Sequence, residues 1–252
     1  MSTRATVKIE AHEICGADGE NMRVLLASPS AKPRGVVIFC HPATGSCDTF
    51  RKDLGELADA DWLALALEAP FCRLPPTFLR GLAHPENERT LLLLGARNAR
   101  LALDFVETTT GRATQRGVLV GRNYGVTVGG ILAATEPRLG TFVLQGGIPS
   151  LTEFWRTSSH PVAARARATV SKGQLSRYIE TLRDLDASAH AAQLAAKRTL
   201  MQFGTHDDWI TAADVAMHFG PYLPEEQIKW YDDNHDMTSA AVRTDYQRML
   251  DL

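Results

Sequence analysis

Several features that define common protein classes are missing from this sequence. Lysine and arginine number 27 against 29 aspartates and glutamates, so the formal charge is -2 and no basic field attracts nucleic acid. No apolar run approaches the about 20 residues that a membrane-spanning helix needs. The N-terminus mixes charged and β-branched residues and lacks the apolar core of a signal peptide. We therefore expect a cytoplasmic protein that neither enters a membrane nor binds nucleic acid.

Patterns typical of metal centres, disulfide scaffolds and multidomain chains are also missing. The cysteines at positions 15, 40, 47 and 72 form no CxxC pair, so we expect reduced thiols and no metal site. No repeat or Gly/Ser-rich linker divides the chain, which favours one domain over residues 1–252. Nothing in the sequence calls for a cofactor. A homodimer is compatible with the composition.

What the sequence does contain is an alternation of short apolar runs and amphipathic stretches, which predicts an α/β protein. The first two runs flank a turn-rich segment at 16–19, as in an antiparallel hairpin. Most later runs are continuously apolar, which is typical of strands buried on both faces of a parallel sheet. We expect eight strands, at 6–13, 22–28, 35–40, 62–67, 117–121, 141–144, 199–203 and 227–231, with helices on both faces of a mostly parallel sheet. The expected helices are 48–59, 88–108, 126–135, 211–219 and 238–250. Residues 150–197 are rich in Ala and Arg with little strand character, and we expect them to form a helical lid.

The end of the strand at 117–121 has an unusual sequence. In open parallel sheets, ligands bind beyond the carboxyl ends of the strands. Here the strand runs through Gly121, Asn123 and Gly125 into a helix of small residues, which is the layout of a nucleophile elbow. The apex of such an elbow usually carries Ser, Cys or Asp. Asn tolerates positive φ and so fits the turn, but its amide is a very poor nucleophile.

Two later strand ends carry an acid and a histidine. The strand at 199–203 is followed by Asp207 and Asp208, of which Asp207 is the expected acid and Asp208 the alternative. The strand at 227–231 is followed by His235, just before the last helix, where an imidazole would reach back over the elbow. These positions give the catalytic set Asn123, Asp207 and His235, in the order nucleophile position, acid, histidine.

That order and the elbow resemble the α/β-hydrolase superfamily, and in particular its lidded members similar to dienelactone hydrolases and small esterases. The resemblance covers nearly the whole chain, including the segment His41-Pro42-Ala43-Thr44-Gly45 after an early strand. It implies an oxyanion hole formed by the N–H groups of Ala43 and Tyr124. The sequence departs from the family at Asn123, where these members carry Ser or Cys.

The residues around the expected site indicate a small-molecule substrate. His41, Phe71, Trp155 and Trp209 are candidates to surround it, and His41 is also expected to hold the loop after its strand. Aromatic walls favour a medium-sized, partly apolar carbonyl compound.

Three functions are compatible with an amide at the apex. In the first, preferred here, His235 and Asp207 act as a general-base pair without a covalent intermediate, giving ester or lactone hydrolysis or a lyase, isomerase or cyclase reaction. In the second, the chain is a serine-esterase type whose nucleophile was replaced by Asn, by engineering or by drift. In the third, it is a non-catalytic binding protein on a hydrolase scaffold.

Overall fold

A computed structural model describes residues 7–73, 78–111 and 116–251, and its centre is an eight-stranded sheet with the strand order β1-β2-β4-β3-β5-β6-β7-β8. All eight expected strands are present. Position 6, where the first was expected to begin, lies outside the described residues. The strands are β1 (Ile9–Cys15), β2 (Asn21–Ala27), β3 (Val36–Cys40), β4 (Leu63–Leu67), β5 (Gly117–Arg122), β6 (Leu139–Gln145), β7 (Arg198–Gly204) and β8 (Ile228–Tyr231).

The sheet is mostly parallel, as the apolar runs predicted. β2 pairs antiparallel with both β1 and β4, and every pairing from β4 to β8 is parallel. The hairpin between β1 and β2 turns at Gly19, whose φ of 82° favours glycine. β1 lies at the edge and none of its residues is fully buried, whereas every residue of β3 and β4 is buried. Because β5, β7 and β8 run in the same direction, their carboxyl ends lie at the same edge of the sheet.

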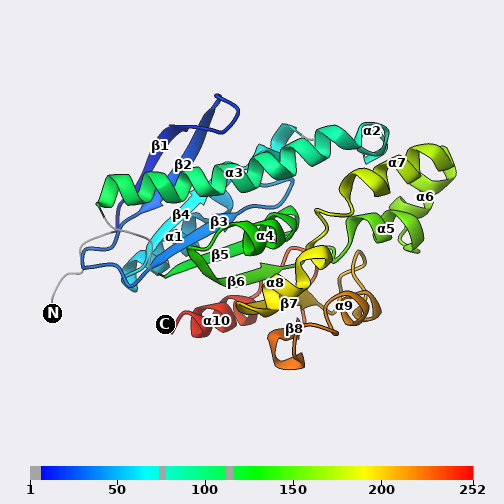
Figure 1. Cartoon of the computed structure of the whole chain (residues 1–252). Coiled ribbons are helices and arrows are strands. Elements are labelled where there is room, and N and C mark those ends of the chain that lie inside the picture. The colour runs from blue at the N-terminus through cyan, green and yellow to red at the C-terminus, as the bar shows by residue number, and fades with distance from the viewer. Residues whose placement is uncertain (1–6, 74–77, 112–115, 252) are drawn as a thin grey trace.

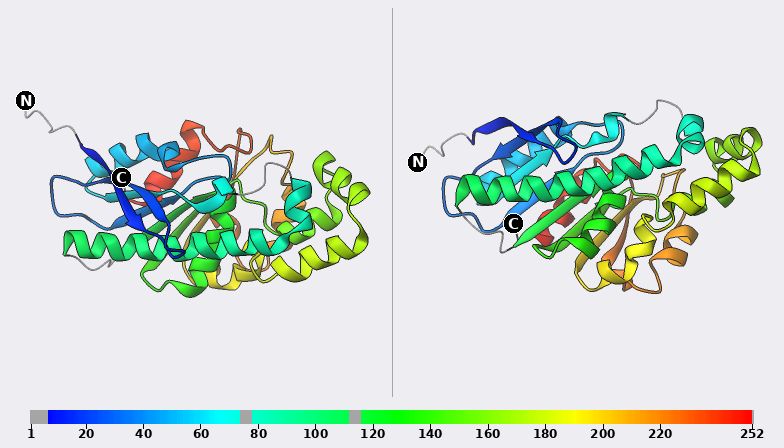
Figure 2. Two further views of the ribbon diagram at one scale, coloured as in Figure 1. Left: turned by 90° about the horizontal axis from the view of Figure 1, so that it is seen from above. Right: turned by 45° about the horizontal axis from the view of Figure 1, so that its top comes forward.

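Helices cover both faces of this sheet, and each face has its own apolar core. One core joins the sheet to α3, α4 and α8, for example through Leu92, Val128 and Leu194. The other joins it to α1 and α10, for example through Leu57 and Tyr246. The left-hand view of Figure 2 shows the long α3 on one side of the sheet, with α1 and α10 on the other. The expected two-sided α/β architecture is confirmed.

The helices begin and end at recognisable signals. α3 begins with Pro85 at its first position, where a missing N–H is tolerated, and ends before Gly111 in the left-handed conformation, with φ of 64°. None of the helices in the described ranges is long and apolar enough to cross a membrane. The α-helices are α1 (Arg51–Asp59), α2 (Phe78–Ala83), α3 (Pro85–Thr110), α4 (Tyr124–Thr135), α5 (Leu151–Thr157), α6 (Pro161–Thr169), α7 (Lys172–Leu182), α8 (Ala191–Ala195), α9 (Ala212–His218) and α10 (Ala240–Met249). The 3₁₀ helices are η1 (Cys47–Phe50), η2 (Pro70–Arg73), η3 (Ala187–His190) and η4 (Glu225–Gln227).

The segment at 150–197 is helical, as expected, but its two halves have different positions. α5, α6 and α7 lie beyond the sheet, at the end of the molecule opposite the two termini (Figure 1), and we call them the lid. η3 and α8 instead pack on α4 and belong to the layer that covers the sheet. Gly130 of α4 allows this packing, because a side chain there would press against Ala187.

Candidate active site

The turn between β5 and α4 has the conformation of an elbow. Asn123 stands between the strand and the helix with φ of 53° and ψ of -114°, a combination that few non-glycine residues adopt. Its N–H donates to the carbonyl of Gln145 (3.0 Å), and its carbonyl accepts from the N–H of Val126 (2.9 Å). A Cβ at Gly121 would overlap the carbonyl of Gly125, and a Cβ at Gly125 would overlap that of Cys40. The two glycines therefore make the turn sharp enough to raise the Asn123 side chain.

The structure brings the predicted acid, histidine and amide into one chain of hydrogen bonds. Nδ1 of His235 lies 2.8 Å from Oδ2 of Asp207, and Nε2 lies 2.7 Å from Nδ2 of Asn123. An amide nitrogen can only donate, so Nε2 must be the accepting nitrogen of a neutral imidazole. The proton then resides on Nδ1 and is donated to Asp207. This is the tautomer in which Nε2 can act as a base toward a substrate.

Asp207, rather than Asp208, is the carboxylate that holds His235. The side chain of Asp207 is fully buried, and its Oδ1 accepts from the N–H of Trp209 (2.9 Å). The side chain of Asp208 is 80% exposed and lies 3.8 Å from Nε2 of His160. Asp207 can orient the imidazole because it is buried and its second oxygen is held by a hydrogen bond. The exposed Asp208 could not do so.

The amide of Asn123 also contacts one of the two expected oxyanion-hole donors. Its Oδ1 accepts from the N–H of Ala43 at 3.4 Å, which is a long hydrogen bond. Tyr124 is the first residue of α4, so its N–H has no acceptor within the helix. One carboxamide thus covers both the lone pair of His235 and one donor of the expected oxyanion hole. A substrate carbonyl that reaches these groups must displace or slide past it.

A cavity of about 180 Å³ opens above the elbow. His235 and Asn123 form its reactive side, and Trp209, whose ring centroid lies 6.0 Å from that of His235, forms one wall. Most other lining side chains are apolar: Pro42, Ala43, Ile148, Leu151 and Trp155. The cavity therefore suits a partly apolar molecule with a polar group directed at the elbow.

Two of the predicted substrate-binding residues lie elsewhere. His41 is fully buried, with Nε2 accepting from the N–H of Ala69 (2.8 Å) and Nδ1 facing the carbonyl of Pro42 (2.7 Å). Phe71 is also buried and packs against the rings of His41 and Tyr124. Neither contributes to the lining of this cavity. Both support the loop and helix that carry the Ala43 and Tyr124 N–H groups.

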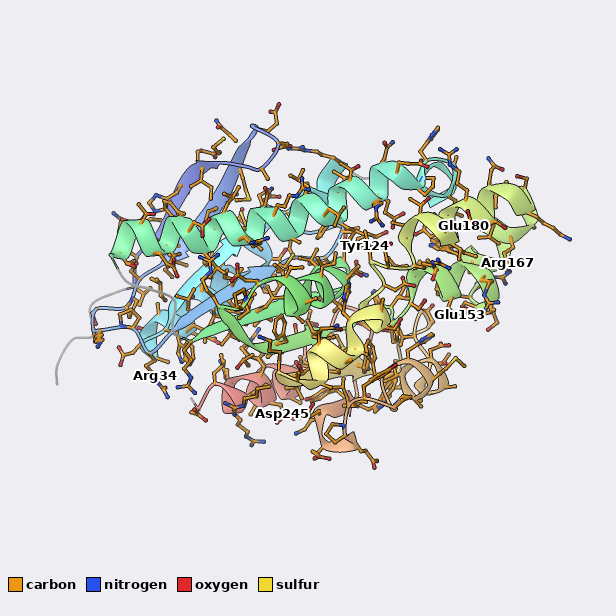
Figure 3. All side chains as sticks on the ribbon, viewed as in Figure 1. Arg34, Tyr124, Glu153, Arg167, Glu180 and Asp245 are labelled. Atoms are coloured by element: carbon orange, nitrogen blue, oxygen red, sulfur yellow. The ribbon has the colours of Figure 1, made fainter. Side chains whose placement is uncertain are left out.

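A buried carboxylate that the sequence did not single out lies beside the elbow. Oε1 of Glu88 on α3 accepts from the hydroxyl of Tyr124 (2.5 Å), and Oε2 accepts from that of Tyr178 on α7 (3.1 Å). Trp155 of the cavity wall donates to the Tyr178 oxygen (3.2 Å). Burial raises the pKa of Glu88 and those of both tyrosines above their usual values. Figure 3 shows Tyr124 at the end of α4 that is nearest the lid helices, which carry Glu153, Arg167 and Glu180.

The described part of the chain contains no group of three or more histidine, cysteine or acidic side chains arranged to hold a metal ion.

Comparison with known proteins identifies the architecture. No protein-family model and no curated protein sequence matches the chain. Its structure is similar to TT1662 from Thermus thermophilus, with 18% identity over 97% of this chain and 98% of that one and a TM-score of 0.67. It is similar to a carboxyl esterase from Bacillus coagulans, with 11% identity over 96% of both chains and a TM-score of 0.62. It also resembles the acylaminoacyl peptidase of Pyrococcus horikoshii, with 12% identity, 98% of this chain covered and a TM-score of 0.71, although it spans only 41% of that protein.

The chain has the α/β-hydrolase fold. Proteins with many different activities share this fold. Similarity at identities of 11–18% therefore shows the fold of this chain and not its activity. The function must be argued from the side chains at the elbow.

Proposed function

We propose that this protein is an α/β-hydrolase-fold enzyme that acts on a small, partly apolar carbonyl compound such as an ester or lactone. His235, oriented by Asp207, is the general base, and no covalent acyl-enzyme forms because Asn123 supplies no nucleophilic oxygen. One observation carries the proposal. Nδ1 of His235 lies 2.8 Å from an oxygen of the buried Asp207 carboxylate, and Nε2 lies 2.7 Å from the amide nitrogen at the apex of the elbow.

In the proposed reaction the substrate carbonyl takes the place of the Asn123 oxygen. The N–H groups of Ala43 and Tyr124 then stabilise negative charge that develops on the substrate oxygen. The displaced carboxamide turns to hold the substrate. Nε2 of His235 removes a proton from a water, which attacks the carbonyl carbon, or from a carbon next to the carbonyl, which starts elimination, isomerisation or cyclisation. In hydrolysis the acyl C–O bond then breaks and the imidazolium returns the proton to the departing alkoxide; in the other reactions it returns the proton to the departing group or to the product.

The apolar cavity wall supports the choice of substrate class. Trp155, Trp209, Ile148 and Leu151 offer apolar contact area. The polar lining groups, among them Thr44, Arg122 and Asp236, could bind the polar part of such a molecule. The similarity to proteins named as esterases agrees with a carbonyl substrate.

The test begins with a panel of p-nitrophenyl esters, lactones and enolisable ketones. On any substrate that is turned over, His235→Ala should lower kcat by about 10²- to 10⁴-fold, the usual contribution of a positioned base. His206→Ala is the matched control, because that imidazole is 69% exposed and pairs with Asp232 at the surface. Wild-type protein should show no pre-steady-state burst and no acyl adduct by mass spectrometry.

Unchanged turnover in His235→Ala would contradict the general-base role. Binding of panel compounds without any His235-dependent product would instead indicate the non-catalytic protein. A burst or an acyl adduct on wild-type protein would contradict the non-covalent route.

A further inference from the structure

A second cavity, of about 100 Å³, lies on the side of the elbow that faces α1 and α10. This volume exceeds that of one water, whose share of the liquid is about 30 Å³. Polar side chains from five parts of the chain line it: Thr49 of η1, Asp53 of α1, Arg122 at the end of β5, Gln145 of β6, and Thr238, Ser239, Arg243 and Tyr246 in and just before α10. The left-hand view of Figure 2 shows α1 and α10 on the same face of the sheet. Among described lining residues, only Arg122 is shared with the cavity above Asn123.

Arg122 lacks a countercharge in direct contact. Its Nε and Nη2 both donate to Oε1 of Gln145 (3.2 and 3.0 Å), and its guanidinium lies over the ring of Phe50, 5.1 Å from the centroid. No carboxylate within the described ranges forms an ion pair with it, and Nη1 donates to none of the described residues. Burial lowers its pKa, but a guanidinium stays protonated. A buried cation without a paired anion is costly, so a complementary anion in the adjoining cavity would be stabilised.

The acidic groups near this cavity are already engaged or lie farther away. Asp53 accepts from the Tyr246 hydroxyl (2.5 Å) and from Nε of Arg243 (3.3 Å). Glu56 lies 4.0 Å from the same Arg243 nitrogen, and Asp236 lines the other cavity. Within the lining itself, two arginines face one carboxylate, which leaves an excess of positive charge beside the hydroxyl groups of Thr238 and Ser239.

We propose that this cavity binds a small free oxyanion, a phosphate or a carboxylate, between the guanidinium groups of Arg122 and Arg243. Arginine presents several N–H donors in a planar fork that matches two oxygens of such an anion. Arg122 precedes the elbow residue, and Thr238 follows the loop that carries His235. The bound anion therefore connects the elbow to the histidine loop. This site is independent of the reaction proposed above.

The test measures binding directly. Thermal unfolding and titration calorimetry are recorded with sodium phosphate and with sodium acetate, each against sodium chloride at equal ionic strength. Wild-type protein should show a higher midpoint with phosphate or acetate than with chloride, because a ligand that binds only the folded state stabilises it. Arg122→Gln should abolish this difference. Arg243→Gln, which leaves the elbow unchanged, should weaken binding about tenfold.

Arg248→Gln is the matched control, since this arginine is also on α10 but is 74% exposed and pairs with Asp245. It should bind phosphate as the wild type does. The proposal is overturned if wild-type protein responds equally to phosphate, acetate and chloride, or if Arg122→Gln and Arg243→Gln both keep the full response. A folded Arg243→Gln protein, checked by circular dichroism, keeps the test decisive if Arg122→Gln does not fold.

A further arm separates a free anion from an acidic group of the substrate. Where a substrate is known, KM is measured for acidic and for neutral substrates, with and without phosphate. If the cavity binds a free anion, phosphate should not change the ratio of the two KM values. A rise in KM confined to acidic substrates would mean that phosphate competes with the substrate's own acid group, which would overturn the free-anion assignment. The binding measurements need no turnover, so their outcome does not depend on the proposed function.

Discussion

At the elbow, backbone conformation and side-chain chemistry are set by different residues. Gly121 and Gly125 permit the sharp turn, while Asn123 only has to tolerate a φ of 53°. The imidazole is also held from the side away from the apex, by Asp207, whose other carboxylate oxygen accepts from the N–H of Trp209. The apex can therefore exchange its chemistry without loss of the surrounding geometry.

From this geometry we predict that Asn123→Ser creates a reactive serine. The hydroxyl would replace the amide near Nε2 of His235, which is 2.7 Å from the present side-chain nitrogen, and would be activated as in a Ser-His-Asp site. A serine-directed phosphonate should label this variant, with adduct formation measured by mass spectrometry, and should leave the wild type unlabelled. Asn123→Ala is the control for labelling elsewhere. Absence of a phosphonate adduct on folded Asn123→Ser would show that the imidazole is not aligned with the apex.

At the scale of the elements, Glu88 joins three helices through one buried carboxylate. α3 carries it, α4 supplies the Tyr124 hydroxyl and α7 supplies that of Tyr178. The lid is thereby connected to the elbow helix through a group whose ionisation is opposed by burial. A substitution that removes this titratable carboxyl group should therefore change how the stability of the protein depends on pH.

We predict that Glu88→Gln changes this pH dependence with a definite sign. Burial raises the pKa of Glu88 in the folded protein above its ordinary value of 4.5. As the pH rises past that value, the unfolded chain loses the proton first, so the free energy of unfolding of the wild type falls relative to Glu88→Gln until the folded-state pKa is passed. Urea unfolding of both proteins, from about pH 4 to about pH 8, measures the difference.

Glu86→Gln provides a control of opposite sign on the same helix turn. The backbone and Arg177 lower the pKa of this exposed carboxylate, so any stability it contributes is lost as the pH falls. If the free energy of unfolding of the wild type rose with pH relative to that of Glu88→Gln, the result would contradict a raised pKa for the buried Glu88.

The sequence predicted elements better than it predicted contacts between them. All eight strands could be located because buried parallel strands such as β3 and β4 are continuous apolar runs. The elbow could be located because its glycines have fixed spacing. Glu88 could not, since a glutamate in the first turn of a helix is normally a solvated group favoured there by the helix dipole. Its burial depends on Tyr178, which lies 90 positions away in the sequence.

The different positions of the two halves of residues 150–197 could not be predicted from the sequence for a similar reason. Residues 187–195 are rich in small residues, as is α6, and composition does not show which surface a short helix covers. Their position is determined by the close packing of Ala187 against Gly130 of α4. Likewise, His41 and Phe71 follow strands near the site, and only the three-dimensional structure shows that both are enclosed by protein.

At the scale of the whole molecule, one sheet separates two apolar cores. Leu57 of α1 belongs to one and Leu103 of α3 to the other, and both are fully buried. Because both cores use the same strands, we expect the chain to unfold as one domain.

We predict that Leu57→Ala and Leu103→Ala each lower the free energy of unfolding by about 2–5 kcal/mol. Their effects should add to within about 0.5 kcal/mol, because the two sites lie on opposite faces of the sheet. Far-ultraviolet circular dichroism and tryptophan fluorescence should give coincident urea transitions for all variants. Met217→Ala, at a 64% exposed side chain, should change stability by no more than about 0.5 kcal/mol. Separate transitions for the two probes would contradict a single cooperative unit.

The close approach of backbone segments at the elbow restricts how this protein can diversify. If codons 121–125 were randomised together and folded clones were selected, positions 121 and 125 should return glycine, since any side chain there would collide with a main-chain oxygen. Position 123 should return a broad set of small and polar residues. New reactivity can therefore enter this scaffold through a single codon.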